Sequence, residues 1–290
     1  MNNMYPVSVV LVTHNSEKVI ADALDSVLEC NVSEVIVVDC GSDDSTHEIV
    51  TGKQRVQLIS IGNEGYGRGN NAGIALATQD FVLILNPDVL ITLVEFEKLF
   101  NFCSTLANPS IVAPKMYHQS GVNKVYRRDS QFVGPRKYVD KVCGAAMMFP
   151  RTLFQQLNGF DPNIFLYFEE TDLCYRAKKI GSDILVCGLA EVEHSKSGST
   201  PSSSKYEFLR GWHDGWSKLY FVSKCSNNKI EKLFFISKTL IQTYIKIITK
   251  GISKNLDGQR RERNKLLGMK AFIHGDEAFG ADGKARFTDK

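Results

Sequence analysis

An unbroken apolar run ends in a turn that carries a carboxylate. Residues 81–85 read Phe-Val-Leu-Ile-Leu, and Asn86, Pro87 and Asp88 follow directly. Such a run is typical of a buried parallel strand, and proline, which has no N–H to give to a sheet, ends it. Open α/β sheets bind ligands at the carboxyl ends of their strands. Asp88 would suit Mg²⁺ or Mn²⁺ carrying a diphosphate, although Asn-Pro-Asp is equally good turn chemistry.

A second acid, Asp39, follows the apolar residues 35–38. An acidic residue at this place commonly accepts a hydrogen bond from a ribose hydroxyl or a base N–H. The alternative is an N-cap for the helix predicted over residues 46–50. Because Asp88 would lie at the same edge of the sheet, we favour the nucleotide role for Asp39.

Residues 63–73, Asn-Glu-Gly-Tyr-Gly-Arg-Gly-Asn-Asn-Ala-Gly, are rich in glycine. Glycine lets backbone approach a bulky ligand, and the helix predicted over 70–78 would offer its N-terminus to negative charge. The spacing matches neither a dinucleotide fingerprint nor a P-loop. Taken alone, the stretch is also compatible with a flexible turn.

Glu169, Glu170 and Asp172 place three carboxylates within four residues, behind the aromatic stretch 165–168. Acids are favoured in a first helical turn, and Asp172 can pair with Arg176 four residues later. A partly desolvated carboxylate there would also have the raised pKa that a general base requires. His194 follows the strand predicted over 183–187, and a lone histidine is more often a structural hydrogen-bonding group than a ligand.

Strands and helices alternate along the chain in a way that predicts a parallel sheet with right-handed crossovers. Residues 116–141 are predicted to be irregular, and the Ser/Gly/Pro-rich residues 195–204 to be mobile. Strands are predicted over 7–12, 35–38, 56–60, 81–85, 142–149 and 183–187, with helices over 20–28, 46–50 and 70–78 and others starting at Thr92 and near Glu169.

The composition limits the classes of partner and the cellular compartment that we expect. The 290 residues carry a net charge of +3, which is too mild to indicate a nucleic-acid partner, so none is expected. Seven cysteines, none in a Cys-x-x-Cys pair, favour buried thiols in a reducing compartment over disulfides or a zinc site. Neither a signal peptide nor an apolar run of about 18 residues is visible. We therefore expect a cytoplasmic protein.

The order of these motifs resembles that of family 2 inverting glycosyltransferases with a GT-A fold. Within that family the chain is most similar to bacterial rhamnosyltransferase-type enzymes of O-antigen and cell-wall polysaccharide synthesis, over about residues 7–225. The motifs are Val-Ser-Val-Val-Leu-Val-Thr-His-Asn-Ser (7–16), Val-Ile-Val-Val-Asp-Cys-Gly-Ser-Asp-Asp-Ser-Thr (35–46), Asn-Glu-Gly-Tyr-Gly-Arg-Gly-Asn-Asn-Ala-Gly (63–73), Leu-Asn-Pro-Asp-Val (85–89), Cys-Gly-Ala-Ala-Met-Met-Phe-Pro (143–150), Gly-Phe-Asp (159–161), Phe-Glu-Glu-Thr-Asp-Leu-Cys-Tyr-Arg (168–176) and His194.

The resemblance implies an α/β fold, with a Rossmann-like, mostly parallel central sheet flanked by helices and a C-terminal helical appendage. It also assigns roles to residues that bind the nucleotide and the donor sugar. Asp39 matches the acid that contacts the base or ribose. The other matching positions are Thr13, Asn15, Asn63, Gly67, Asn70, Asn71 and Asn86.

The resemblance places Asp88 as the metal-binding carboxylate, with His194 completing the site and Mg²⁺ or Mn²⁺ as the cofactor. Asn86 replaces an acid of the family's D-x-D motif, so weaker metal affinity is expected. Glu170 stands where the family has its catalytic base, usually the shorter Asp. Glu169 is therefore kept as the reserve candidate.

The implied activity is inverting transfer of a sugar from a nucleotide-sugar donor to a glycan or a polyprenyl-diphosphate-linked acceptor. dTDP-rhamnose is the first donor expected, with UDP- and GDP-sugars as alternatives. A further alternative is a catalytically silent nucleotide-sugar-binding module of an assembly complex. A sugar nucleotidyltransferase would need a basic glycine-rich loop near the N-terminus, which is missing after Val12.

The C-terminal part differs in composition. Residues 229–265 hold ten Lys or Arg against three acids, interleaved with apolar residues at helical spacing. This pattern predicts a basic amphipathic helix, which could lie on the inner face of an anionic membrane or pack on the catalytic domain. We expect a catalytic domain at 1–225 and an appendage with a flexible tail at 226–290. The sequence leaves open whether chains form a homo-oligomer.

Overall fold

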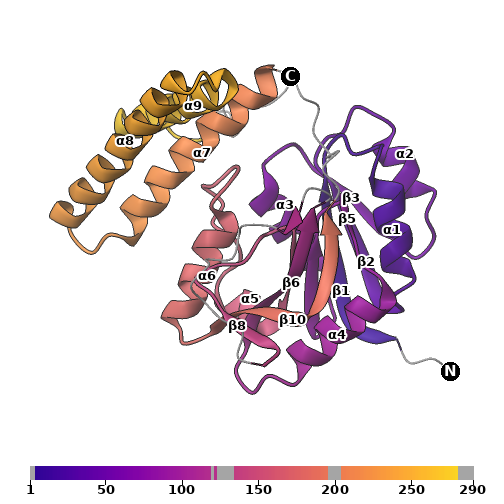
Figure 1. The fold of residues 1–290 in the computed structure, drawn as a ribbon. Helices are drawn as coiled ribbons and strands as arrows, with labels where there is room; N and C mark the ends of the chain where they lie inside the picture. Colours follow the sequence, from indigo (N-terminus) through magenta and orange to yellow (C-terminus); the bar gives the residue numbers. More distant parts are fainter. Residues whose placement is uncertain (1–3, 119–120, 123–133, 195–203, 280–290) are drawn as a thin grey trace. The chain divides into compact units, whose positions relative to one another are not determined.

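The computed structural model describes residues 4–118, 121–122, 134–194 and 204–279 (Figure 1). Contacts divide the chain into two compact units, one formed by Met1–Asp161 with Glu170–Thr200 and the other by Pro162–Glu169 with Pro201–Lys290. The boundary predicted at 225/226 falls inside the second unit, between two of its helices. None of the helices in the described ranges is long and apolar enough to cross a membrane.

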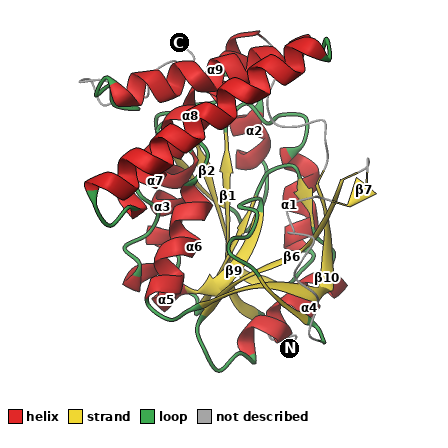
Figure 2. Cartoon of the chain, turned by 60° about the vertical axis from the view of Figure 1, so that its left-hand side comes forward, coloured by secondary structure: helices red, strands yellow, loops and turns green. Residues whose placement is uncertain are grey.

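The first unit is a mixed sheet with helices on both faces (Figures 1 and 2). Its strand order is β3-β2-β1-β4-β9-β6-β10-β5, with β7 paired to β6 and β8 to β10. The strands are β1 (Tyr5–Thr13), β2 (Val32–Asp39), β3 (Gln57–Ser60), β4 (Phe81–Leu85), β5 (Val89–Leu90), β6 (Ser110–His118), β7 (Gly121–Val122), β8 (Arg136–Tyr138), β9 (Ala146–Pro150) and β10 (Asp183–His194).

Strands β1 to β4 are joined by parallel pairs, as the alternation of strands and helices predicts. β9 then runs antiparallel between β4 and β6, and β6 pairs parallel with β10. The helices of this unit are α1 (Ile20–Leu28), α2 (Thr46–Thr51), α3 (Tyr66–Leu76), α4 (Leu93–Ser104), α5 (Arg151–Gln156) and α6 (Glu169–Lys179).

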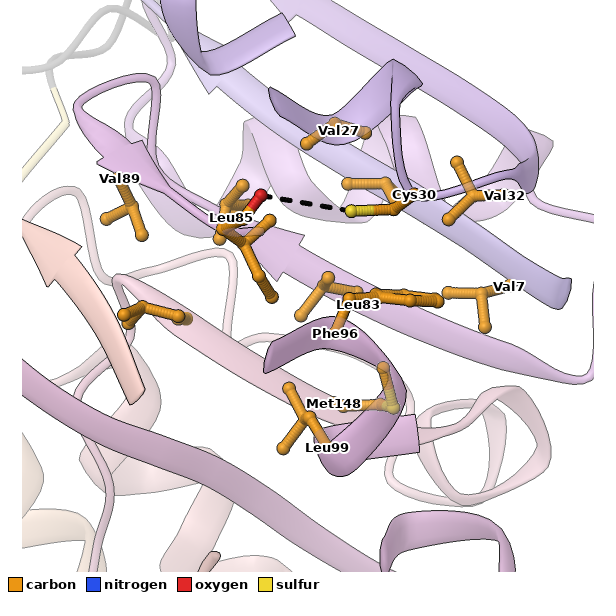
Figure 3. Close-up of a cluster of buried hydrophobic side chains, with 14 of the residues drawn as sticks. Val7, Val27, Cys30, Val32, Leu83, Leu85, Val89, Phe96, Leu99 and Met148 are labelled. Carbon is orange, nitrogen blue, oxygen red and sulfur yellow. Dashed lines mark hydrogen bonds between the residues drawn. The ribbon is translucent and has the colours of Figure 1, made fainter. Parts of the chain in front are cut away.

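Both faces of the sheet are buried, which explains the unbroken apolar runs. Leu83 and Leu85 of β4 join one core with Phe96 and Leu99 of α4, which Figure 3 shows in close-up. Their neighbours in β4 join the core on the opposite face, together with α3, α5 and α6. Thr92 caps α4 by accepting a hydrogen bond from Glu95 N at 3.4 Å, as its capping-box pattern predicts.

Several predicted boundaries were wrong. Helix α3 begins at Tyr66 rather than at 70, and β9 begins at Ala146 rather than at 142. β10 runs on to His194, beyond the predicted end at 187, because it continues past an irregularity in its pairing with β6. Part of the region predicted to be irregular forms the end of β6, β7 and β8. Residues 119–120 and 123–133 of that region lie outside the described residues. So do residues 195–203 of the segment 195–204 that was predicted to be mobile, whose last residue, Ser204, begins a helix.

The described part of the second unit contains three long helices, α7 (Ser204–Cys225), α8 (Lys229–Ile252) and α9 (Leu256–Ile273). The basic segment 229–265 was predicted as one helix but forms parts of two, with Lys254 at a left-handed φ of +55° between them. Helices α7 and α9 pack so closely that a Cβ added at Gly215 would lie only 1.9 Å from the Lys265 carbonyl oxygen. Glycine at this position is therefore needed for the contact.

Candidate active site

Two strands place a carboxylate and an imidazole side by side. Asp88 lies in the turn between β4 and β5, and His194 is the last residue of β10. β5 pairs antiparallel with β10 so that Val89 lies opposite His194. As a result Asp88 Oδ1 is 3.4 Å from His194 Nε2, and the Asp88 side chain is 6% exposed. The structure therefore brings together the two residues predicted to bind metal.

This pair fits a divalent cation. Two ligands about 2.1 Å from one Mg²⁺ at neighbouring octahedral positions lie about 3 Å apart, close to the separation of this pair. Asn86 Oδ1 is also buried and lacks a hydrogen-bond partner among the described residues. Within the same residues, no group of three or more His, Cys, Asp or Glu side chains could hold a metal. A cation at Asp88 would thus need further oxygen ligands, such as those of a diphosphate.

A short loop links this corner to the start of α6. The Asn86 N–H donates a hydrogen bond to the Ala145 carbonyl oxygen at 2.8 Å. Next to it, a Cβ added at Gly144 would lie 3.5 Å from the Cβ of Glu170. The loop therefore contacts the end of β4 on one side and Glu170 on the other.

Glu170 has the electrostatics of a candidate general base. Burial raises the pKa of its carboxyl, and the positive charge of Lys141 opposes that shift. The thiol of Cys143 lies in the same neighbourhood: burial raises its pKa, and the charges of Glu170 and Asp88 raise it further. A carboxyl with a raised pKa can take a proton from a hydroxyl more readily than an ordinary one.

The other two acids of α6 differ in environment. Asp172 is fully buried, and its Oδ2 lies 2.7 Å from Arg176 Nε. Arg176 Nη2 also donates to the Gly159 carbonyl oxygen at 2.7 Å, so the ion pair anchors α6 to the preceding turn. The structural reading of this pair is thereby confirmed. Glu169, the reserve base, is the first residue of α6 and is buried.

Asp39 ends β2 and is buried, with Thr13 opposite it in β1. Its Oδ1 accepts hydrogen bonds from Ser42 N at 3.1 Å and from Ser42 Oγ at 2.6 Å. It does not cap α2, whose N-cap is Ser45. Of the two readings of Asp39, the helix cap is therefore wrong.

The loop after β1 lies beside Asp39. Asn15 has a left-handed φ of +52°, and its Oδ1 accepts a hydrogen bond from Asp43 N at 2.9 Å. His14 Nδ1 lies 2.9 Å from the Cys40 carbonyl oxygen. Because a carbonyl oxygen can only accept, this contact places a proton on Nδ1. His14 Nε2 and Thr13 Oγ1 are both buried without a partner in the described part of the chain.

Two glycines of α3 pack closely against the sheet. A Cβ at Gly69 would lie 2.7 Å from Val12 Cγ1, and one at Gly73 would lie 2.6 Å from Val10 Cγ1. Gly67 is buried in the first turn of the helix. The backbone N of Asn63, just before α3, would be 3.8 Å from a Cβ at Gly41.

The two asparagines of α3 have different surroundings. Asn70 Nδ2 donates to the Tyr66 carbonyl oxygen at 2.9 Å, and its buried Oδ1 has no partner among the described residues. Asn71 instead bonds the backbone of Phe160 in both directions, at 2.8 and 2.9 Å. Its amide therefore holds the turn around Phe160 in place.

Sequence reasoning missed some groups. It treated His14 only as part of a loop. The signal for His14 was its position in the polar stretch Thr-His-Asn-Ser, directly after the first strand. The strain before α6 has no signal in the sequence: Tyr167 and Phe168 both have left-handed φ values, +66° and +73°. Bulky residues rarely adopt this region, and such strain concentrates at functional sites.

The family model described as glycosyl transferase family 2 matches residues 8–180, more than half of the chain. The chain belongs to this family. The matched range includes Asp39, Asp88 and Glu170, and it ends before His194.

Curated relatives include transferases of several organisms. A low-salt glycan biosynthesis hexosyltransferase, Agl10 of Haloferax volcanii, is 26% identical over 65% of this chain and 67% of its own. An N-acetylglucosaminyl-diphospho-decaprenol L-rhamnosyltransferase of Mycobacterium tuberculosis is 28% identical over 63% and 76%. The rhamnosyltransferase WbbL of Escherichia coli is 26% identical over 60% and 78%.

Solved structures share the fold of this glycosyltransferase. S. aureus TarS 1-349 is similar with a TM-score of 0.56 and 16% identity, covering 98% of this chain and 97% of that one. GalNAc-T7, solved with UDP, GalNAc and Mn²⁺, has a TM-score of 0.57 and 14% identity, covering 94% and 57%. The fold is thus the predicted GT-A α/β fold.

Proposed function

We propose that this glycosyltransferase moves a sugar from a nucleotide-sugar donor to an acceptor hydroxyl with inversion, using a divalent cation at Asp88 and His194 and Glu170 as the base. The observation that carries the proposal is the 3.4 Å approach of Asp88 to His194, with Glu170 packed against the loop that contacts the end of β4.

The donor nucleotide would lie along the carboxyl ends of β1, β2 and β4. Asp39 would accept from the ribose or the base, beside the unpartnered Thr13 Oγ1 and His14 Nε2. Asn70 and Asn86 offer two further buried acceptors without partners among the described residues. Such atoms after β1, after β4 and in α3 favour a polar ligand, because a buried acceptor left unsatisfied costs about 1–3 kcal/mol.

Asp88 and His194 would hold Mg²⁺ or Mn²⁺, which would offset the charge developing on the leaving nucleoside diphosphate. Glu170 would take the proton from the acceptor hydroxyl as that oxygen attacks the anomeric carbon opposite the leaving group. Gly144 would leave space for Glu170 and the acceptor. The backbone of Tyr167 and Phe168 would fix where α6 begins.

The names of the relatives favour a rhamnosyl donor, so dTDP-rhamnose is the first candidate and UDP- and GDP-sugars come next. The acceptor would be a glycan or a polyprenyl-diphosphate-linked sugar of a bacterial surface polysaccharide, reached from the cytoplasmic side. The catalytic domain would extend over 1–225. The silent binding module stays as the alternative if no donor is turned over.

Thermal-shift titration with dTDP-rhamnose, UDP-sugars and GDP-sugars, with and without Mn²⁺, tests the proposal. We expect one nucleotide class to raise the melting temperature, and to do so more strongly with Mn²⁺. NMR of the product from that donor should then show an inverted anomeric configuration. A retained configuration, or no stabilisation by any sugar nucleotide, would contradict the proposal.

A further inference from the structure

Helix α8 leaves most of its large apolar side chains exposed. Its buried residues are two threonines, Thr239 and Thr243. Thr243 Oγ1 contacts Met269 Sδ of α9 at 3.8 Å, and Gly251 approaches Gln259, whose Nε2 donates to the Ile247 carbonyl oxygen at 3.1 Å. The face of α8 that packs on its neighbours in the second unit therefore has two threonines at its most buried positions, with Ile236, Leu240 and Ile247 half-buried beside them.

The opposite face is apolar and exposed. Its side chains fall within about 120° around the helix axis, in two groups separated by Ser237, and they span about 33 Å on a helix that rises about 1.5 Å per residue. Ile230 is 82% exposed, Phe234 61% and Ile252 79%. We call this surface the outer stripe; it consists of Ile230, Leu233, Phe234, Ile241, Tyr244, Ile245, Ile248 and Ile252.

A stripe of this size needs a partner. Monomeric proteins seldom expose contiguous apolar patches larger than a few hundred Å², and larger ones mark interaction surfaces. Figure 2 shows α8 alongside α7 and α9, which contact its other faces. Nothing in the described part of the second unit covers the outer stripe.

The charge of α8 favours an anionic lipid surface over a second copy of the chain as the partner of the outer stripe. Helix α8 carries five lysines and a single acid, Glu231. At about 100° of rotation per residue, Lys229 and Lys238 border the outer stripe on its two sides. A second copy of the chain would place these positive charges against their own kind. An anionic lipid surface would attract them. Because this electrostatic attraction acts across about 8–10 Å of salt solution, the lysines on the far side of the helix also contribute to binding.

We infer that the outer stripe of α8 lies in the interfacial layer of an anionic membrane, with its flanking lysines at the headgroups. An amphipathic helix with an apolar face and a lysine-bearing polar face has this mode of binding. The biological role of this binding rests on the proposed function. Binding at the membrane favours lipid-linked acceptors, because their reactive sugars lie at the same surface. Membrane binding itself requires no turnover.

Vesicle flotation of the full chain tests the inference, without donor, acceptor or metal. We expect binding to phosphatidylcholine vesicles that contain phosphatidylglycerol and little binding to phosphatidylcholine alone. The variant Phe234→Ser/Ile241→Ser/Ile248→Ser should bind at least about tenfold more weakly, because it removes three apolar side chains from the interface. Its exposed positions should leave the fold intact, which circular dichroism checks.

Two further variants complete the test. Val94→Ser/Leu189→Ser removes apolar side chains that are 57% and 51% exposed elsewhere and should float like the wild type. Lys238→Glu/Lys246→Glu should lose the preference for phosphatidylglycerol, which tests the charge independently of the stripe.

Three results would overturn the inference. The first is no flotation, or equal flotation of the stripe variant. The second is equal binding to both vesicle types. The third is a dimer in light scattering that the stripe variant abolishes, which would make a second copy the partner. Transfer to a water-soluble acceptor should persist in the stripe variant, so a failure of the proposed chemistry and a failure of membrane binding give separate results.

Discussion

The Tyr66 hydroxyl donates a hydrogen bond to the Gly144 carbonyl oxygen at 2.7 Å. Tyr66 is the first residue of α3, and Gly144 belongs to the loop that packs against Glu170. One bond therefore ties the predicted donor-binding helix to the support of the candidate base.

Replacing Tyr66 by Phe removes this bond and keeps the ring. A hydrogen bond of this kind contributes about 1 kcal/mol net, so kcat should fall by roughly fivefold if the loop shifts. Steady-state kinetics with the donor found by thermal shift measures the effect. Tyr5→Phe is the control. It removes the hydrogen bond from the Tyr5 hydroxyl to Glu97 and should leave kcat unchanged. An unaltered kcat in Tyr66→Phe would mean that the bond does not position the base.

The close packing of α3 on the sheet predicts a large cost for a single methyl group. In Gly73→Ala the new Cβ would lie 2.6 Å from Val10 Cγ1 and 2.9 Å from Val38 Cγ2. Overpacking of this kind destabilises by about 1–3 kcal/mol, and urea unfolding measures it. Gly62→Ala is the matched control, because nothing lies within 4 Å of its new Cβ. Equal stability of the two variants would contradict the packing described for α3.

The sequence was sufficient to predict the parallel strands β1 to β4, the end of β4 and the pairing of Asp88 with His194, but it did not reveal β6 or the antiparallel direction of β9. Each apolar run is buried on both faces, so periodicity was a reliable guide there. It could not reveal β5, a two-residue strand, although β5 is what sets Val89 opposite His194. The packing role of Gly69 and Gly73 was also hidden, because it depends on valines distant in the sequence.

The appendage shows the same limit. Helical spacing predicted a basic amphipathic segment, but spacing alone cannot say which face is buried. The burial of Thr239 and Thr243 could be seen only from their packing in the second unit.

The raised pKa of Glu170 predicts an acid limb in the pH dependence of kcat/KM. Under the proposed mechanism Glu170 must be deprotonated to act as the base, so activity should rise with pH through a value above the pKa of an ordinary glutamate. Lys141→Met removes the positive charge that lowers this pKa, so the limb should move to higher pH, whereas Lys141→Arg should keep it in place. A limb that does not respond to Lys141→Met would assign it to another group.

The raised pKa of Glu170 also predicts how the stability of the fold changes with pH. Glu170 binds its proton more tightly in the folded than in the unfolded state, so its contribution to stability is greatest below the ordinary glutamate pKa and is lost as the pH rises through the folded value. Glu170→Gln should abolish this loss, which urea unfolding at several pH values would measure. A wild type and variant with parallel stability curves would contradict the raised pKa.

Metal binding should depend on both members of the Asp88–His194 pair. Asp88→Ala should abolish Mn²⁺ binding in the presence of nucleoside diphosphate, and His194→Ala should weaken it by at least about tenfold. Electron paramagnetic resonance of free Mn²⁺ gives the affinity without requiring turnover. His47→Ala, an exposed histidine on α2, is the control. Wild-type Mn²⁺ affinity in both site variants would place the cation elsewhere.

Glu170→Gln tests the central claim most directly. The substitution preserves the shape of the side chain and removes its ability to take a proton. The account predicts that the variant binds the donor and Mn²⁺ like the wild type, while transfer to the acceptor falls by about 10²–10⁴-fold, the usual contribution of a general base. Transfer near the wild-type rate would contradict it and would turn attention to Glu169.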